Sequence, residues 1–136
     1  MATQNQLPRQ QSTEQKRAAR AWQNIESVGE SEQKKYGTLA RKLPAMIQTN
    51  GLGQTLAFLR AKGGQDQSNG HNLICNHVST WVREQVNAQG DGDLLTWIIQ
   101  ESSDAYRRAT TESIVFAVWL RRFVEAKDWG DVGGDD

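Results

Sequence analysis

The sequence has little cysteine, little proline and no long hydrophobic run. One Cys in 136 residues cannot form an internal disulfide, which fits the reducing cytosol. Only two Pro residues favour helices over a turn-rich β fold. The longest apolar run, Ile114 to Leu120, has seven residues, whereas a membrane span needs ~20. The polar start from Met1 to Gln6 has no signal-peptide pattern, so we expect a cytoplasmic protein without a membrane segment.

The net charge is also zero, but the charged residues are distributed unevenly along the chain. Sixteen Lys and Arg residues balance sixteen Asp and Glu residues, which at first speaks against a nucleic-acid partner. Residues 1–42 hold eight bases and four acids (+4), residues 43–88 hold three and two (+1), and residues 89–136 hold five and ten (−5). The zero therefore combines a basic first part with an acidic last part.

Many of the bases occur in pairs or near-pairs along the chain. Paired bases on several helices can follow a phosphate backbone, because phosphate contacts and counterion release supply most of the affinity for nucleic acid. Ordinary solvated helix surface is the alternative that composition favours, and no helix-turn-helix, zinc-finger, RRM or KH pattern is present. The pairs are Lys16/Arg17/Arg20, Lys34/Lys35, Arg41/Lys42, Arg60/Lys62, Arg107/Arg108 and Arg121/Arg122.

Apolar residues recur every three or four positions, which predicts an all-α fold. Ser12 and Gln15 have capping-box spacing, and Asp93 is a good N-cap. Pro44 predicts a kink or a break, because proline removes one helical hydrogen bond. No strand-like alternation and no internal repeat is present. We expect a compact bundle of about six helices, with the fifth buried on several sides and the last one central, at about residues 13–28, 32–50, 52–62, 71–88, 94–99 and 103–127.

The two ends of the chain lack this periodicity. Residues 1–12 are Gln-rich and polar, and residues 128–136 are acidic and Gly-rich. We therefore expect a single helical domain over 13–127, a flexible, disordered arm over 1–12 and an acidic flexible tail over 128–136.

The sequence offers little for catalysis or metal binding. His71 and Cys75 are four residues apart, but a zinc site needs three or four ligands, and nothing marks Cys75 as an activated nucleophile. His77 lies among apolar residues and fits a core histidine. Glu112, four residues after Arg108 in an apolar stretch, fits a contact between helices better than acid catalysis. We expect no enzymatic activity, no metal and no cofactor, with an enzyme using His71, Cys75 or Glu112 as a minor alternative.

Two stretches of the chain carry a resemblance to a known family. The first begins at Lys35-Tyr36 and continues over 41–62, with the pattern Pro-x-Met-Ile-x-x-Asn-Gly-Leu at 44–52. The second has Tyr-Arg and Thr-x-Glu within 106–112 and Trp-Leu-x-Arg at 119–122. Over about residues 14–127 the chain resembles the small α-helical subunit of the type III-B CRISPR effector, the Cmr or RAMP-module complex.

The resemblance implies a subunit with no catalytic activity of its own. In this family several copies stack head to tail as a minor filament beside the backbone subunit that holds the CRISPR RNA, and basic surfaces help to hold the guide–target RNA duplex. The expected partners are therefore other subunits of the complex, further copies of this chain and the CRISPR RNA–target RNA duplex, with no membrane and no small-molecule substrate. The basic first half and the acidic last part would then complement one another between copies.

The bases inside or beside these motifs are the candidate RNA contacts. A guide-based complex needs protein groups that read A-form shape and phosphates rather than sequence. A helical protein–protein adaptor that binds no nucleic acid is the alternative. The candidate nucleic-acid-binding residues are Arg41, Lys42, Arg60, Lys62, Arg107 and Arg108, followed by Lys16, Arg17 and Arg20.

Overall fold

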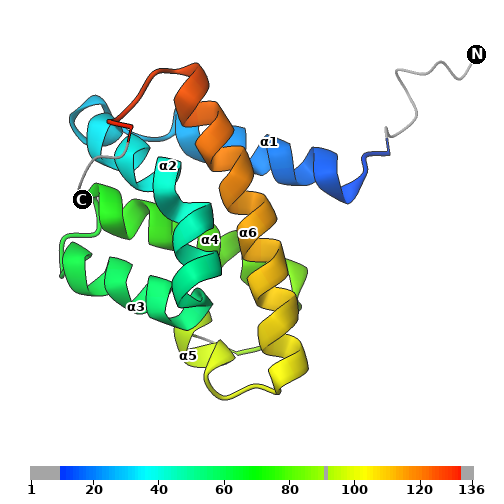
Figure 1. The fold of residues 1–136 in the computed structure, drawn as a ribbon. Helices are drawn as coiled ribbons and strands as arrows, with labels where there is room; N and C mark the ends of the chain where they lie inside the picture. The colour runs from blue at the N-terminus through cyan, green and yellow to red at the C-terminus, as the bar shows by residue number, and fades with distance from the viewer. Residues whose placement is uncertain (1–9, 91, 133–136) are drawn as a thin grey trace, which may run out of the picture.

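Helices make up nearly all of the regular structure in the described part of the chain (Figure 1). The structure is a computed structural model and describes residues 10–90 and 92–132. The all-α prediction is confirmed. In chain order the elements are α1 Thr13–Glu26, a 3-10 turn η2 Glu30–Glu32, α2 Gln33–Asn50, α3 Leu52–Gly63, α4 Gly70–Gln85, α5 Leu94–Ile98 and α6 Ser103–Ala126.

Side chains next to the helix starts explain where several helices begin. The Ser12 hydroxyl accepts from the Gln15 N–H, and the Gln15 side chain accepts from the Ser12 N–H, so the predicted capping box is present. Asp93 accepts from the Thr96 N–H at the start of α5, and Ser102 accepts from the Ala105 N–H at the start of α6. These bonds satisfy N–H groups that the first helical turn leaves without a partner.

The helix α2 runs through Pro44 without a break. Proline removes one hydrogen bond of the helix and crowds the preceding turn, at a cost of about 3 kcal/mol. Packing offsets this loss, because Leu43, Pro44 and Ile47 are all buried and α2 lies along α6 and against α4 and α3. Tertiary burial therefore keeps α2 in one piece.

The last helix is the central element, as predicted. It contacts each of α1 to α5, and in Figure 1 it runs from the lower edge of the molecule to the top. Phe116 is fully buried on α6 and stacks on Trp81 of α4 with ring centroids 5.6 Å apart. No helix in the described part of the chain is long and apolar enough to cross a membrane.

The short helix α5 is less enclosed than its apolar sequence predicts. Leu94 and Ile98 are buried, but Ile99, the residue that follows the helix, is 65% exposed. A five-residue helix can turn only one face to the core. In α5 that face carries Leu94 and Ile98, which are four residues apart. The expectation of burial on several sides is therefore wrong at Ile99.

Part of the predicted C-terminal tail packs on α2. The carbonyl of Trp129 accepts from Arg41 Nε at 2.8 Å, and the Asp131 N–H donates to Thr38 Oγ1 at 3.0 Å. This close approach needs a helix residue without a side chain, since a Cβ at Gly37 would lie 2.5 Å from the Trp129 backbone. The packed part of the chain thus extends beyond residue 127, while 133–136 and most of the predicted arm, residues 1–9, lie outside the described residues.

Replacing Gly37 with Ala should displace this C-terminal segment. Alanine alone would favour the helix by about 1 kcal/mol over glycine, but the new Cβ meets backbone, which cannot rotate away. We expect trypsin to cut after Lys127 at least about fivefold faster in the variant, because local opening exposes the site. Gly29→Ala is the matched control, since nothing lies within 4 Å of a Cβ there. Equal cleavage of the two variants would contradict the prediction.

Candidate nucleic-acid interface

Arg17, a candidate RNA contact, forms a partly buried cluster with Glu112 and Trp81. Its Nε and Nη2 donate to the two Glu112 oxygens at 2.6 and 2.9 Å, and both side chains are only 14% exposed. Trp81 Nε1 donates to Glu112 Oε2 at 2.8 Å. The hydrogen bonding to Glu112 raises the pKa of Arg17. The guanidinium is therefore used to join α1, α4 and α6.

Glu112 thus joins helices, in agreement with the preferred interpretation, but its partner is not Arg108. Arg17 lies 95 positions away in sequence, and no local pattern indicates the pair. Sequence reasoning also missed Trp81 as the second donor. The single signal was a carboxylate in an apolar stretch, which predicts a buried partner without naming it.

Arg20 lies one turn further along α1 and is also occupied. It makes two hydrogen bonds to Glu84, at 2.9 and 3.2 Å. Its guanidinium lies 5.2 Å from the centre of the Trp81 ring, within the range of a cation–π contact. Its side chain keeps 31% exposure, so Arg20 mainly ties α1 to α4.

Arg41 and Lys42 lie on α2, and both are half-buried. Arg41 holds the C-terminal segment through the Trp129 carbonyl and comes within 3.8 Å of Asp128. With 13% of its side chain exposed, Arg41 has little surface for a phosphate. This role in the fold also escaped the sequence reasoning, although an isolated Gly37 inside a predicted helix is a signal of close approach.

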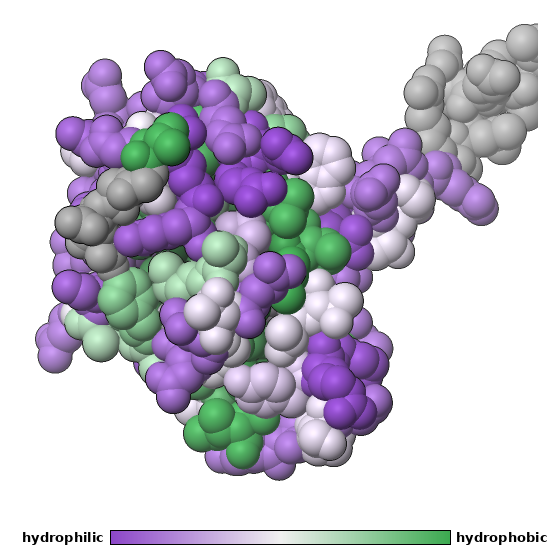
Figure 2. All heavy atoms as spheres, in the orientation of Figure 1, coloured by the Kyte–Doolittle hydropathy of each residue, from purple (hydrophilic) through white to green (hydrophobic). Residues whose placement is uncertain are grey.

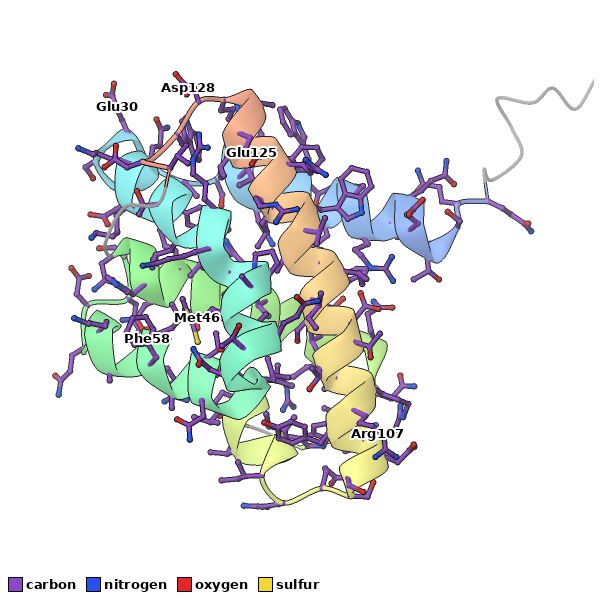
Figure 3. All side chains as sticks on the ribbon, viewed as in Figure 1. Glu30, Met46, Phe58, Arg107, Glu125 and Asp128 are labelled. Carbon is purple, nitrogen blue, oxygen red and sulfur yellow. The ribbon has the colours of Figure 1, made fainter. Side chains whose placement is uncertain are left out.

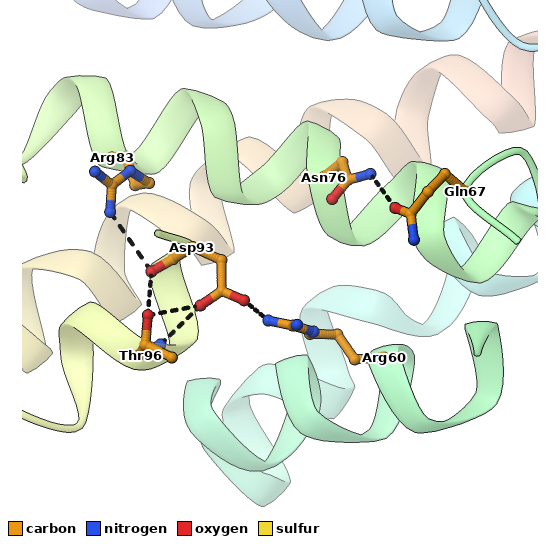
Figure 4. A network of polar contacts seen from close by, with 6 residues as sticks. All are labelled: Arg60, Gln67, Asn76, Arg83, Asp93 and Thr96. Atoms are coloured by element: carbon orange, nitrogen blue, oxygen red, sulfur yellow. Dashed lines mark hydrogen bonds and ion pairs between the residues drawn. The ribbon is translucent and has the colours of Figure 1, made fainter. Parts of the chain in front are cut away.

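Arg60 and Lys62 lie in the last turn of α3, where both are exposed. Arg60 pairs with Asp93, and the Thr96 hydroxyl and Arg83 lie around the same residue (Figure 4). Half of the Arg60 side chain remains exposed. Lys62 makes no ion pair with a described residue. This end of α3 therefore presents one paired and one unpaired base.

The start of α6 carries a pair of exposed candidates. Arg107 and Arg108 are 74% and 58% exposed, and both approach the same carboxylate, Asp104, at 3.7 and 3.5 Å. Figure 3 shows Arg107 at the lower end of α6, with Glu125 and Asp128 at the opposite end. The two bases share one acid, and the second acid at this end, Glu101, makes no ion pair with either of them.

Lys16, on the exposed side of α1, makes no ion pair within the described residues. It lies one position before Arg17 but is not part of the Glu112 cluster. The structure therefore divides eight of the nine candidates into two groups, with Lys42 half-buried on α2. Arg17, Arg20 and Arg41 hold parts of the fold together, whereas exposed bases remain at Lys16, at the end of α3 and at the start of α6.

Several charged residues from the two ends of the sequence form ion pairs with one another within the chain. Lys34 lies 3.9 Å from Asp131, Arg41 lies 3.8 Å from Asp128, and Lys127 lies 2.9 Å from Glu26. In the first two pairs a base of the first half meets an acid of the last part within one molecule, and in the third a base of the last part meets an acid of the first half. The acids Asp128 and Asp131, which were expected to face another copy, already have basic neighbours.

His77 and Cys75 are packed among core residues rather than in a catalytic site. Tyr36, fully buried, lies 2.7 Å from His77 Nδ1, and burial lowers the pKa of His77 to about 4. Burial also raises the pKa of the Cys75 thiol, the opposite of what a nucleophilic thiolate needs. No group of three His, Cys, Asp or Glu side chains in residues 10–90 and 92–132 could hold a metal ion.

The fold and these surfaces define a small all-helical protein with exposed bases on several of its helices. Residues 13–127 match the family described as "CRISPR-associated protein (Cas_Cmr5)", and the chain belongs to that family. The chain is also 27% identical, over 115 residues, to the protein named CRISPR system Cmr subunit Cmr5 of Thermus thermophilus. That match covers 80% of this chain and 90% of the relative. The resemblance seen in the sequence is confirmed.

Proposed function

We propose that this chain is a non-catalytic subunit of a type III-B CRISPR RNA-guided interference complex in antiviral defence. Membership of the family over residues 13–127 supports this role, as does a relative named as a subunit of the Cmr system. Several copies stack as a minor filament beside the backbone subunit. Their basic surfaces stabilise the guide–target RNA duplex without reading its sequence.

The observation that carries the RNA contact is the exposed pair at the start of α6. Arg107 and Arg108 share one carboxylate, Asp104, so this end of the helix can meet a phosphate without first breaking a buried ion pair. Arg60 and Lys62 add a second exposed position beside α5, because Arg60 pairs with the N-cap residue of that helix. Modest charge at separate positions is enough when several copies act along one duplex, since linked contacts add by effective concentration.

A salt series tests the RNA contact directly. Anisotropy of a labelled guide–target RNA duplex should show weak, sequence-independent binding that falls as salt rises. Arg107→Ala should lower the slope of log K against log salt by roughly 0.7–0.9, the value for one phosphate contact, and the double variant with Arg108→Ala should lower it about twice as far. Lys34→Ala, matched in charge and exposure (79% against 74%), should leave the slope unchanged.

A protein–protein adaptor without nucleic-acid binding is the alternative function. It predicts normal incorporation into the assembled complex but no salt-dependent RNA binding by the chain, and no effect of Arg107→Ala on the affinity of the complex for target RNA. That combination of results would reject the RNA contact while leaving the role as a subunit intact.

A further inference from the structure

An apolar groove lies open between α1 and α6. Its volume is about 390 Å³, and Val115, Val118 and Trp119 form its apolar lining. Val115 is 37% exposed, and Val118 and Trp119 are half-buried. Figure 2 shows hydrophobic side chains gathered over the middle of α6. Exposed apolar surface of this kind, with a polar rim, is typical of a contact site.

The same chain exposes an apolar side chain at another place. Ile99 is 65% exposed in the turn between α5 and α6, and a second hydrophobic patch lies at the lower end of the molecule beside α5 (Figure 2). The groove is large enough for a branched aliphatic side chain and parts of its neighbours. Ile99 therefore has the size and the polarity that the groove accepts.

Charges near the two features are complementary. The groove is flanked by Arg122, 64% exposed and 3.7 Å from its nearest acid, and by Glu14. Glu101, two residues after Ile99, is exposed and makes no ion pair with a described residue. An acid two residues after Ile99 thus matches a base beside the groove.

We propose that Ile99 of one copy inserts into the α1/α6 groove of the next copy, with Glu101 facing Arg122. The proposal rests on the proposed stacking and names the surfaces that make it. The two surfaces differ, so the contact is heterologous: each copy offers a free groove or a free Ile99 after it has bound one neighbour. Such a contact adds further copies in a line when the rotation between copies does not close a ring.

Cross-linking between the two surfaces tests this contact. Ile99→Cys and Val115→Cys in one chain, treated with a bismaleimide of about 8 Å reach in the assembled complex, should give a ladder of dimers and larger species. Linkage within one copy is excluded by distance, because residues 103 to 115 span about 18 Å along the helix axis. The native Cys75 is 4% exposed and serves as background in the wild type.

Matched variants decide between the possible results. Ile99→Cys with Ala57→Cys, an exposed position on α3, should give no ladder. No ladder from Ile99→Cys with Val115→Cys, in complexes that native mass spectrometry shows to hold two or more copies, would overturn this contact and leave stacking intact. Complexes holding a single copy would overturn the stacking and the contact together.

A charge exchange gives a second readout in the same complex. Arg122→Glu and Glu101→Arg should each reduce the ladder severalfold, because each places like charges together. The double exchange should restore it, since the opposite charges then meet again. A double variant no better than the singles would overturn the predicted facing of Glu101 and Arg122.

Discussion

Replacing Glu112 with Ala should lower the free energy of unfolding by about 3 kcal/mol, the low end of the range for losing one partner of a buried ion pair, because this pair is only partly buried. Arg17 would lose both of its short hydrogen bonds, and Trp81 Nε1 would lose its acceptor. Both members of the pair are 14% exposed, so water cannot fully replace the carboxylate. A buried donor left without a partner destabilises more than the same bond contributes when it is made.

Urea unfolding of the full chain measures this effect. Glu125→Ala is the matched control, because Glu125 lies on the same helix but is 40% exposed and 3.7 Å from its base. Exposed pairs of this kind contribute about 0–1 kcal/mol. A loss for Glu112→Ala no larger than that for Glu125→Ala would contradict the assignment of Glu112 as the junction of three helices.

A double replacement separates the contribution of the ion pair from the cost of leaving one buried charge without a partner. Arg17→Met with Glu112→Leu removes both charges, and apolar residues of similar volume in place of a buried pair are often neutral or stabilising. Trp81 still loses its acceptor, so we expect a stability between that of the wild type and that of Glu112→Ala. A double variant less stable than Glu112→Ala would show that the site depends on packing rather than on unpaired charge.

Local signals allowed much of the fold to be predicted. Ser12 and Asp93 cap helices as their sequence context predicts, because a capping bond involves residues only three apart. The course of α2 through Pro44 depends instead on burial against other helices, and the docking of Trp129 depends on Gly37, far earlier in the chain. Contacts over such separations leave no periodic pattern in a single sequence.

The sequence identifies the basic residues of the candidate site but not their surroundings in the fold. Sequence reasoning could find the paired bases but could not say which were already occupied, since the acids that occupy Arg17, Arg20 and Arg41 are 95, 64 and 87 positions away. Pairing with near neighbours, as at Arg107 and Arg108, leaves bases exposed because both partners stay on one helix surface. Long-range pairing leaves little of Arg17 and Arg41 exposed, although Lys34 and Arg60 stay exposed in their long-range pairs. The structure therefore shifts the RNA-binding hypothesis toward the ends of α3 and α6.

Acid should destabilise the protein through His77 before it protonates most carboxylates. Burial lowers the pKa of His77 to about 4, from an ordinary value of 6.5, and raises the pKa of the neighbouring Tyr36 hydroxyl well above its ordinary range. The hydroxyl therefore keeps its proton and can donate to Nδ1 of neutral His77 across 2.7 Å, in the tautomer that carries the imidazole proton on Nε2. A protonated imidazole could not accept this bond.

Between pH 6.5 and 4 the unfolded chain binds a proton at His77 that the folded chain does not. The stabilising contribution is thus complete above pH 6.5 and is lost as the pH falls toward 4. The difference between a pKa of 6.5 in the unfolded chain and about 4 in the folded chain corresponds to about 3 kcal/mol. Urea unfolding at pH 7.5, 6, 5 and 4 should show this loss in the wild type.

His77→Gln provides the comparison that isolates this residue. The amide oxygen of glutamine can accept from the Tyr36 hydroxyl, and the side chain does not titrate. The carboxylates are the same in both proteins, so subtracting the two pH profiles cancels their contribution. The wild type should lose about 3 kcal/mol more than the variant between pH 7.5 and 4. Parallel profiles would contradict the prediction, because they would show that His77 takes up its proton as readily in the folded chain as in the unfolded chain.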